Sequence, residues 1–136
     1  MDKTPPPLDI QRALKDDHQQ ILALFRQYLA LPPDSRQSIV DQILHRLSSH
    51  LEREEALIFN EIRMSGQQGQ QLIGNAEMEH EEVKTMIHDL QESEADDDQE
   101  MDEAFEDMMQ TVRAHFITEE RDLFPLVKRS SGASPL

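Results

Sequence analysis

Apolar residues return every three or four positions through four long segments of the chain, which is the spacing of an amphipathic helix. Each segment also carries a His on its apolar stripe, and the second and fourth carry a Glu as well. The stripes are Leu14, His18, Ile21, Phe25 and Leu29; Val40, Ile43, Leu47, His50, Glu54, Leu57 and Ile58; Ile73, Ala76, His80, Val83, Ile87 and Leu90; and Phe105, Met108, Val112, His115, Glu119, Asp122, Leu123 and Leu126.

Three short breaks separate the four segments. Residues 31–35 contain two prolines, residues 65–69 contain two glycines, and residues 92–98 are polar and acidic. Long helices joined by short connections run antiparallel to their neighbours. The sequence therefore predicts an all-α, antiparallel up-down-up-down four-helix bundle. The alternative, a long helical hairpin that completes its core by dimerising, fits the short connections less well.

The bundle is expected to occupy residues 8–129. Residues 1–7 are rich in proline and predict an unstructured start, and residues 130–136 predict a frayed tail. A chain of 136 residues is long enough to bury a core within one domain.

Charge and composition exclude several classes of function. The net charge of −15 argues against nucleic acid or anionic lipid as a partner. The chain has no run of about 18 apolar residues that could span a membrane. Its start lacks a basic-then-apolar signal, so a cytoplasmic protein is expected. The absence of Cys leaves only His, carboxylate and water as metal ligands.

An internal repeat relates the two halves of the chain. Residues 50–59 match residues 115–124, and residues 17–21 match residues 79–83. The first two helices therefore resemble the last two, and a duplicated hairpin would place related residues around a pseudo-two-fold axis.

The polar residues on the apolar stripes are the candidate site. A Glu four residues after a His lies on the same helix face, one turn away. Buried carboxylates without partners cost several kcal/mol each, and metal ions remove this cost. Imidazole and carboxylate without sulfur suit iron or manganese, and also zinc. Six such groups suit two ions that share carboxylates: His18, His50, Glu54, His80, His115 and Glu119.

The order His…His-x-x-x-Glu…His…His-x-x-x-Glu on four helices resembles the hemerythrin family, in its bacterial branch of HHE cation-binding domains, from about residue 10 to residue 128. The resemblance implies two non-haem iron ions with an oxo or hydroxo bridge, which manganese or zinc could replace. It further implies that Glu54 and Glu119 bridge the ions. His18 and His50 would bind one iron, and His80 and His115 the other.

One position departs from the oxygen-carrying members of that family. They have another His four residues after the third-helix His, where this chain has Lys84. The departure leaves a coordination position open to water, Glu77 or Glu81, and Lys84 is expected to donate a hydrogen bond rather than to ligate. Glu55 and Glu120 are expected on a solvated face, with contact to the ligands as the alternative.

The resemblance implies a protein that binds or reacts with O2 or a related small molecule, nitric oxide or peroxide, for sensing, scavenging or iron handling. Such a protein is a metal-binding or redox-sensing protein rather than a classical enzyme, and it would act as a monomer or homodimer with an unidentified protein or redox partner. Two alternatives remain: a metal-free helical interaction module, and a ferritin-like protein that oxidises or stores iron. Ferritin-like sites place the Glu three residues before the His, whereas in the pairs His50/Glu54 and His115/Glu119 the order is reversed and the spacing is four.

Overall fold

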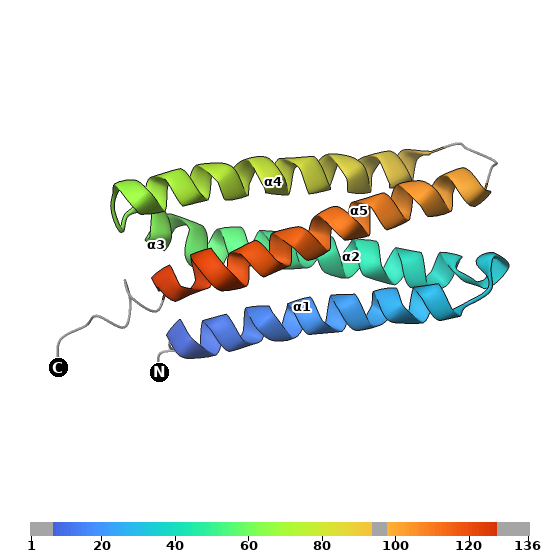
Figure 1. Cartoon of the computed structure of the whole chain (residues 1–136), viewed down its shortest axis with the longest axis horizontal. Coiled ribbons are helices and arrows are strands. Elements are labelled where there is room, and N and C mark those ends of the chain that lie inside the picture. The colour runs from blue at the N-terminus through green and yellow to red at the C-terminus, as the bar shows by residue number, and fades with distance from the viewer. Residues whose placement is uncertain (1–6, 94–97, 128–136) are drawn as a thin grey trace.

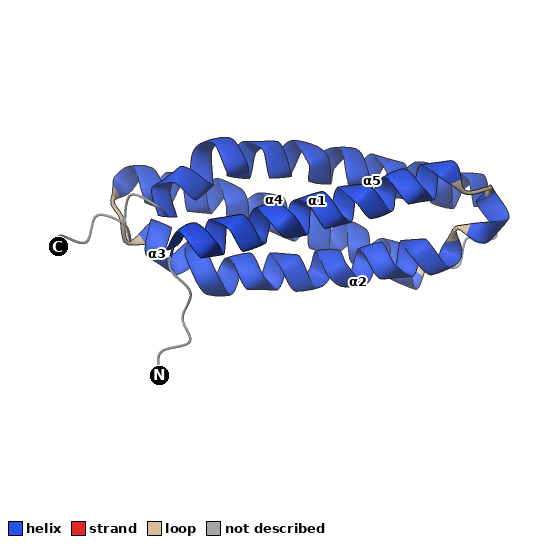
Figure 2. Cartoon of the chain, turned by 90° about the horizontal axis from the view of Figure 1, so that it is seen from below, coloured by secondary structure: helices blue, strands red, loops and turns tan. Residues whose placement is uncertain are grey.

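The computed structural model describes residues 7–93 and 98–127, which form helices and short connections (Figures 1 and 2). The long helices are α1 (Pro7–Ala30), α2 (Gln37–Glu54), α4 (Gln67–Glu92) and α5 (Asp98–Thr118). Two π-helical segments, η2 (Glu55–Phe59) and η3 (Glu119–Leu123), continue α2 and α5, and the short α3 (Asn60–Arg63) follows η2. A 3-10 turn, η1 (Pro33–Ser35), joins α1 to α2.

The four long helices lie side by side with alternating direction. Contacts join α1 to α2, α2 to α4, α4 to α5, and α5 back to α1, so the bundle closes on itself (Figure 1). The all-α antiparallel bundle is confirmed. The expected tail and all of the expected unstructured start except Pro7 lie outside the described residues. No described helix is long and apolar enough to cross a membrane.

A layer of buried polar side chains divides the hydrophobic core into two clusters. Leu14 belongs to the cluster that also contains Phe59 and Phe124, whereas Ile21 belongs to the other cluster, which contains Phe105. His18 lies between Leu14 and Ile21 on α1, and it is fully buried. The apolar side chains on both sides of the layer therefore exclude water from the polar groups in the middle of the bundle.

The helical register shifts by one residue after the buried Glu of α2. A π-helix has hydrogen bonds from residue i to residue i+5, one residue further than in an α-helix. The segment η2 therefore turns Leu57 toward solvent and buries the residues that follow it. Leu57 is 37% exposed, while Ile58, Phe59 and Ile62 are buried. The expectation that Leu57 belongs to the apolar stripe was therefore wrong.

A second difference lies at the C-terminal end of α1. Leu29, expected on the stripe, is 50% exposed, and Tyr28 is buried in its place. The Tyr28 hydroxyl donates to Asp102 Oδ1 on α5 at 2.7 Å, and Arg36 Nη1 donates to Asp102 Oδ2 at 3.1 Å. The buried phenol thus has the hydrogen-bond partner that a tyrosine in a core requires, and the contact fixes α1 against α5.

Gly69 allows α4 to approach α3 closely. A Cβ at this position would overlap the carbonyl oxygen of Ile62 and the hydroxyl of Ser65, whereas a Cβ at Gly74 would meet no atom within 4 Å. The contact with the Ile62 carbonyl involves backbone, which cannot move aside as a flexible side chain can.

We therefore expect Gly69→Ala to lower the free energy of unfolding by about 2 kcal/mol, because it overpacks the contact with α3. Gly74→Ala is the matched control within the same helix and should raise stability by up to about 1 kcal/mol through helix propensity. Denaturant unfolding of both variants tests this, and equal effects of the two substitutions would contradict the close approach.

Candidate metal centre

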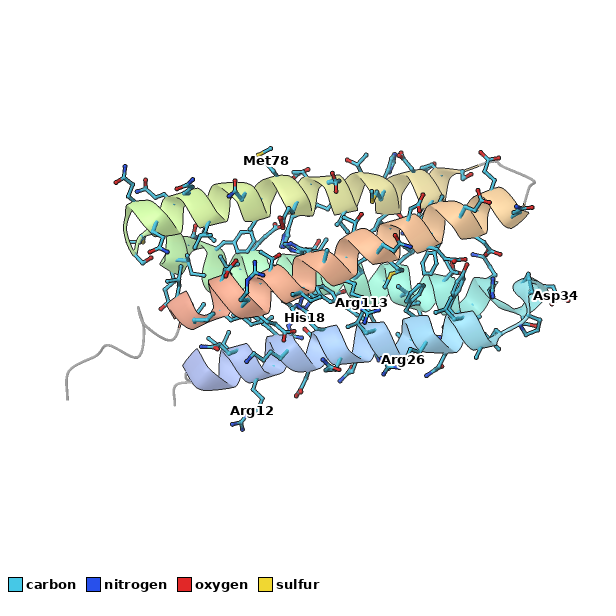
Figure 3. All side chains as sticks on the ribbon, in the orientation of Figure 1. Arg12, His18, Arg26, Asp34, Met78 and Arg113 are labelled. Atoms are coloured by element: carbon cyan, nitrogen blue, oxygen red, sulfur yellow. The ribbon has the colours of Figure 1, made fainter. Side chains whose placement is uncertain are left out.

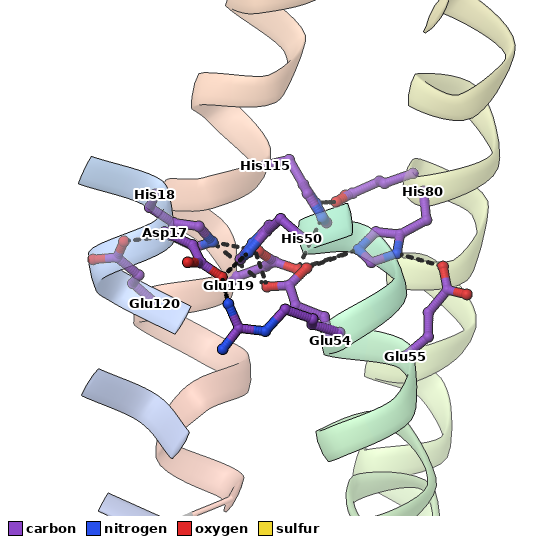
Figure 4. Close-up of polar contacts among 11 residues, drawn as sticks. Asp17, His18, His50, Glu54, Glu55, His80, His115, Glu119 and Glu120 are labelled. Atoms are coloured by element: carbon purple, nitrogen blue, oxygen red, sulfur yellow. Dashed lines mark hydrogen bonds and ion pairs between the residues drawn. The ribbon is translucent and has the colours of Figure 1, made fainter. Parts of the chain in front are cut away.

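Six buried side chains meet in the polar layer at the middle of the bundle (Figure 4). Their ligand atoms form two groups, each with atoms within 4.8 Å of one another, and the groups share Glu54 and Glu119. One group adds His18 and His50, and the other adds His80 and His115. Figure 3 shows His18 pointing into the bundle while Arg12 and Arg26 of the same helix point away from it. The structure thus brings together all six residues singled out in the sequence.

Each imidazole also contacts a carboxylate of the neighbouring helix through its outer nitrogen. His50 Nδ1 lies 3.0 Å from Asp17 Oδ2, His80 Nδ1 lies 2.9 Å from Glu55 Oε2, His115 Nδ1 lies 2.5 Å from Glu79 Oε1, and His18 Nδ1 lies 2.6 Å from Glu120 Oε2. In each pair Nδ1–H donates to the carboxylate. The four bonds run from α1 to α2, α4, α5 and back to α1, and we call them the imidazole–carboxylate ring (Figure 4).

The ring corrects one expectation from the sequence. Glu55 and Glu120 were expected on a solvated face, but both accept hydrogen bonds from the candidate ligands His80 and His18. Asp17 and Glu79 also accept such bonds, although they were not expected to be part of the site. The sequence did contain a pattern that could have identified them, because each of the four ring carboxylates is next to a candidate ligand and the four follow the internal repeat.

The inner nitrogens of the four imidazoles face the two buried carboxylates. His115 Nε2 lies 2.9 Å from Glu119 Oε2, His80 Nε2 lies 3.1 Å from Glu54 Oε1, and His50 Nε2 lies 3.2 Å from Glu54 Oε2. His18 Nε2 lies 3.2 Å from Glu119 Oε1. Atoms that bind one ion at about 2.1 Å and at right angles lie about 3.0 Å apart. These separations therefore fit atoms that share a cation.

The protonation of the imidazoles explains why the layer needs cations. A neutral imidazole carries one N–H, and when that hydrogen is on Nδ1 and bonded to the ring carboxylate, Nε2 presents a lone pair. The lone pairs of His18, His50 and His115 then face carboxylate oxygens and are buried without a hydrogen-bond partner, as are both oxygens of Glu54. Lone pairs facing one another repel unless a proton or metal ion lies between them, and the donor set fits a metal.

Without a metal, protons must serve this purpose, and the two central carboxylates become unequal. Burial disfavours the charge of Glu54, but hydrogen bonds from His18, His50 and His80 outweigh burial and hold its pKa well below the usual value. Burial and the negative charge of Glu54 raise the pKa of Glu119 well above the usual value. The pKa values of the two central carboxylates are therefore shifted in opposite directions in the metal-free centre, and Glu119 is the one that burial and the Glu54 charge favour in the protonated form.

Two basic side chains bind carboxylates of the imidazole–carboxylate ring. Lys84 Nζ lies 2.8 Å from Glu55 Oε2, and Arg53 Nη1 donates to Asp17 Oδ2 at 2.7 Å. Lys84 thus acts on the carboxylate that orients His80, as its position in the sequence suggested. Glu77 pairs with Arg63 at 2.5 Å and is not part of either ligand group. Glu81, His45 and His88 are exposed, the two His as expected.

Phenylalanine rings from both hydrophobic clusters pack against imidazoles of the centre. Phe116 stacks on His18 with ring centroids 3.7 Å apart and planes 7° apart, and Phe59 lies 4.8 Å from His80. These contacts fix the orientation of the two imidazoles. They also place apolar surface where water would otherwise reach the centre.

The inequality of the two carboxylates predicts different effects of neutral substitutions in the metal-free protein. Glu119→Gln should change the free energy of unfolding by less than about 1 kcal/mol, because the amide can donate to Glu54 as the protonated acid does. Glu54→Gln should cost about 3 kcal/mol, because it removes the buried carboxylate charge that His18, His50 and His80 face. Denaturant unfolding near neutral pH with a chelator present measures both values.

The dependence on pH gives a second test of the same inequality. A raised pKa in the folded state contributes stability that is fully present below the unfolded-state pKa and is lost as pH rises through the folded-state pKa. The Glu119 contribution should thus decline as pH rises above the usual range of a Glu, and Glu119→Gln should remove this decline. The same decline in both proteins would contradict the assignment.

Comparison with known proteins bears directly on the centre. The family model described as the hemerythrin HHE cation binding domain matches residues 9–132. Searches of curated proteins and of solved structures found no match. The matched range includes α2, α4 and α5, all but the first two residues of α1, and all six side chains of the centre. The chain therefore belongs to the hemerythrin HHE cation-binding domain family.

Proposed function

We propose that this chain binds two iron ions in the middle of the bundle and uses them to bind or react with O2 or a related small molecule, nitric oxide or peroxide. The observation that carries the proposal is the pair of ligand groups that share Glu54 and Glu119. His18 and His50 would hold one ion, and His80 and His115 the other. The two shared carboxylates would connect them.

The local charge supports two ions rather than one. Glu54, Glu119 and the four ring carboxylates bring six negative charges, and Arg53 and Lys84 bring two positive charges. Four negative charges remain around neutral imidazoles. Two divalent ions would neutralise them, whereas one divalent ion would leave two buried or half-buried charges uncompensated, which is unfavourable in a water-poor interior.

Neighbouring iron ions supply paired one-electron chemistry to a bound diatomic or peroxide molecule. The protein's part in this chemistry is to hold and orient the ligands. Each ring carboxylate keeps the proton of its imidazole on Nδ1 and thereby leaves Nε2 available to a metal. Phe59 and Phe116 limit the access of water, and Lys84 stays on Glu55 instead of ligating.

The alternatives predict different behaviour. A metal-free interaction module would be satisfied by protons alone and would gain no stability from iron. A ferritin-like storage protein would oxidise and retain many irons per chain. Its Glu-x-x-His pattern occurs in these helices at Glu77 and His80, but Glu77 pairs with Arg63 and lies outside both ligand groups. The charge count and the closed ligand set favour the dinuclear centre over both alternatives.

Metal content and an optical spectrum test the proposal. Protein loaded with iron(II) without oxygen should hold two irons per chain, gain near-ultraviolet absorption on exposure to O2, and melt at a higher temperature than chelated protein. Glu119→Ala should lose at least one ion while the far-ultraviolet circular dichroism stays helical. Two irons per chain in this variant would contradict the shared ligand, and a wild-type protein that takes up none would overturn the proposal.

The ring makes a separate prediction about metal affinity. Glu120→Ala removes the acceptor of His18 and should weaken metal binding about 10–100-fold, because the imidazole loses its fixed orientation and part of its basicity. Glu82→Ala is the matched control, since Glu82 is exposed on α4. Competition with a chelator measures both affinities. Equal affinities would show that the ring carboxylates do not support the ligands.

A further inference from the structure

A surface pocket beside the centre has a basic lining in an otherwise acidic protein. It lies between α1 and α2, has a volume of about 280 Å³, and is lined in part by Asp17, His45, Arg46, Ser49 and Arg53. His45, Arg46 and Arg53 share one face of α2 with Ser49, because each lies three or four residues from it. His50 also contributes to its wall.

The other hollows near charged residues have a different character. The pocket beside Arg36 also contains Asp34, Asp41 and Asp102. A pocket between α4 and α5 contains Asp89, Glu100 and Asp107. The chain has 28 acidic and 13 basic residues, so a pocket with two guanidinium groups and a single carboxylate needs an explanation.

The contacts of the two arginines leave positive charge in the pocket. Arg46 Nη1 donates to the neutral amide oxygen of Gln20, so no carboxylate neutralises it among the described residues. Arg53 donates to Asp17 Oδ2, but that same oxygen accepts from His50 Nδ1. One carboxylate therefore serves two donors and neutralises the Arg53 guanidinium only in part.

We propose that this pocket binds a small tetrahedral oxyanion, of which inorganic phosphate is the representative. Two guanidinium groups offer planar pairs of N–H donors that match oxyanion oxygens. The Ser49 hydroxyl and the His45 imidazole add donors at the same wall. The overall negative charge opposes the anion only weakly at physiological salt, because interactions beyond about 8 Å are screened.

The site goes beyond the proposed function and does not depend on it. The anion would lie on the outer side of Asp17, which accepts from His50, and it would contact no residue of the two ligand groups other than His50 at the pocket wall. Binding can therefore be measured on chelated, metal-free protein, and its failure would leave the metal proposal untouched.

The experiment is a calorimetric and NMR titration of metal-free protein with inorganic phosphate at constant ionic strength. Wild-type protein should bind phosphate saturably, with shifts confined to His45 and its neighbours on α2 and to Asp17 and Ile21 on the facing side of α1. Arg46→Gln should weaken the affinity at least about tenfold, since it removes a charged hydrogen-bond donor. Arg12→Gln is the matched control, because Arg12 is an exposed arginine pointing away from the bundle, and it should leave the affinity unchanged (Figure 3).

Two outcomes would overturn the site. One is the absence of saturable binding by wild-type protein, and the other is equal weakening by Arg46→Gln and Arg12→Gln, which would reveal a general charge effect. A third test needs no substitution: NMR shifts that lie away from the pocket lining on α1 and α2 would also overturn the site.

Discussion

Every feature of the centre depends on the hydrogen bond from imidazole Nδ1–H to a carboxylate of the next helix. This bond decides which nitrogen carries the proton, and so directs the Nε2 lone pairs of four imidazoles toward Glu54 and Glu119. The resulting layer is unfavourable in an apolar core unless cations occupy it. The same hydrogen bonds that orient the ligands thus bring together buried groups that need a cation between them. Cation binding and folding are therefore coupled.

Much of this arrangement could be predicted from the sequence. The stripes and breaks predicted the bundle, and four His with two Glu at matching positions predicted which side chains meet. The errors at Leu29 and Leu57 share a cause, since both followed a strict α-helical period. At Leu57 the period is interrupted by η2, and three successive apolar residues there gave no sign of which would be buried. At Leu29 the hydrogen bond of Tyr28 to α5 decided the outcome, which depends on a contact distant in sequence.

The duplication of the hairpin is visible in both helix geometry and chemistry. η2 begins directly after Glu54 and η3 begins at Glu119, so each half widens its helix within one residue of the same point. π-helical turns are frequent at functional sites, and here they let the helix present a Glu to the centre and still return apolar residues to the core. The halves differ in their outer charges, because Lys84 and Arg53 support only one carboxylate of each related pair. Both supported carboxylates, Asp17 and Glu55, belong to the first half of the chain, but each ligand group has one of them, Asp17 behind His50 and Glu55 behind His80.

The imidazole–carboxylate ring also bears on the handedness of the fold. Neighbouring residues on an α-helix are about 100° apart around its axis, so Asp17 always lies on one particular side of His18 as seen from the centre. That side is where α2 lies, because His50 donates to Asp17. Four antiparallel helices could also be arranged in the opposite sense around the bundle axis, and an apolar core distinguishes the two arrangements poorly. In the opposite arrangement α5 would stand beside Asp17, and each imidazole would face the related carboxylate of the other half of the chain. The four hydrogen bonds therefore record which of two mirror-related topologies the chain adopts, and the duplicated halves make the other one its nearest competitor.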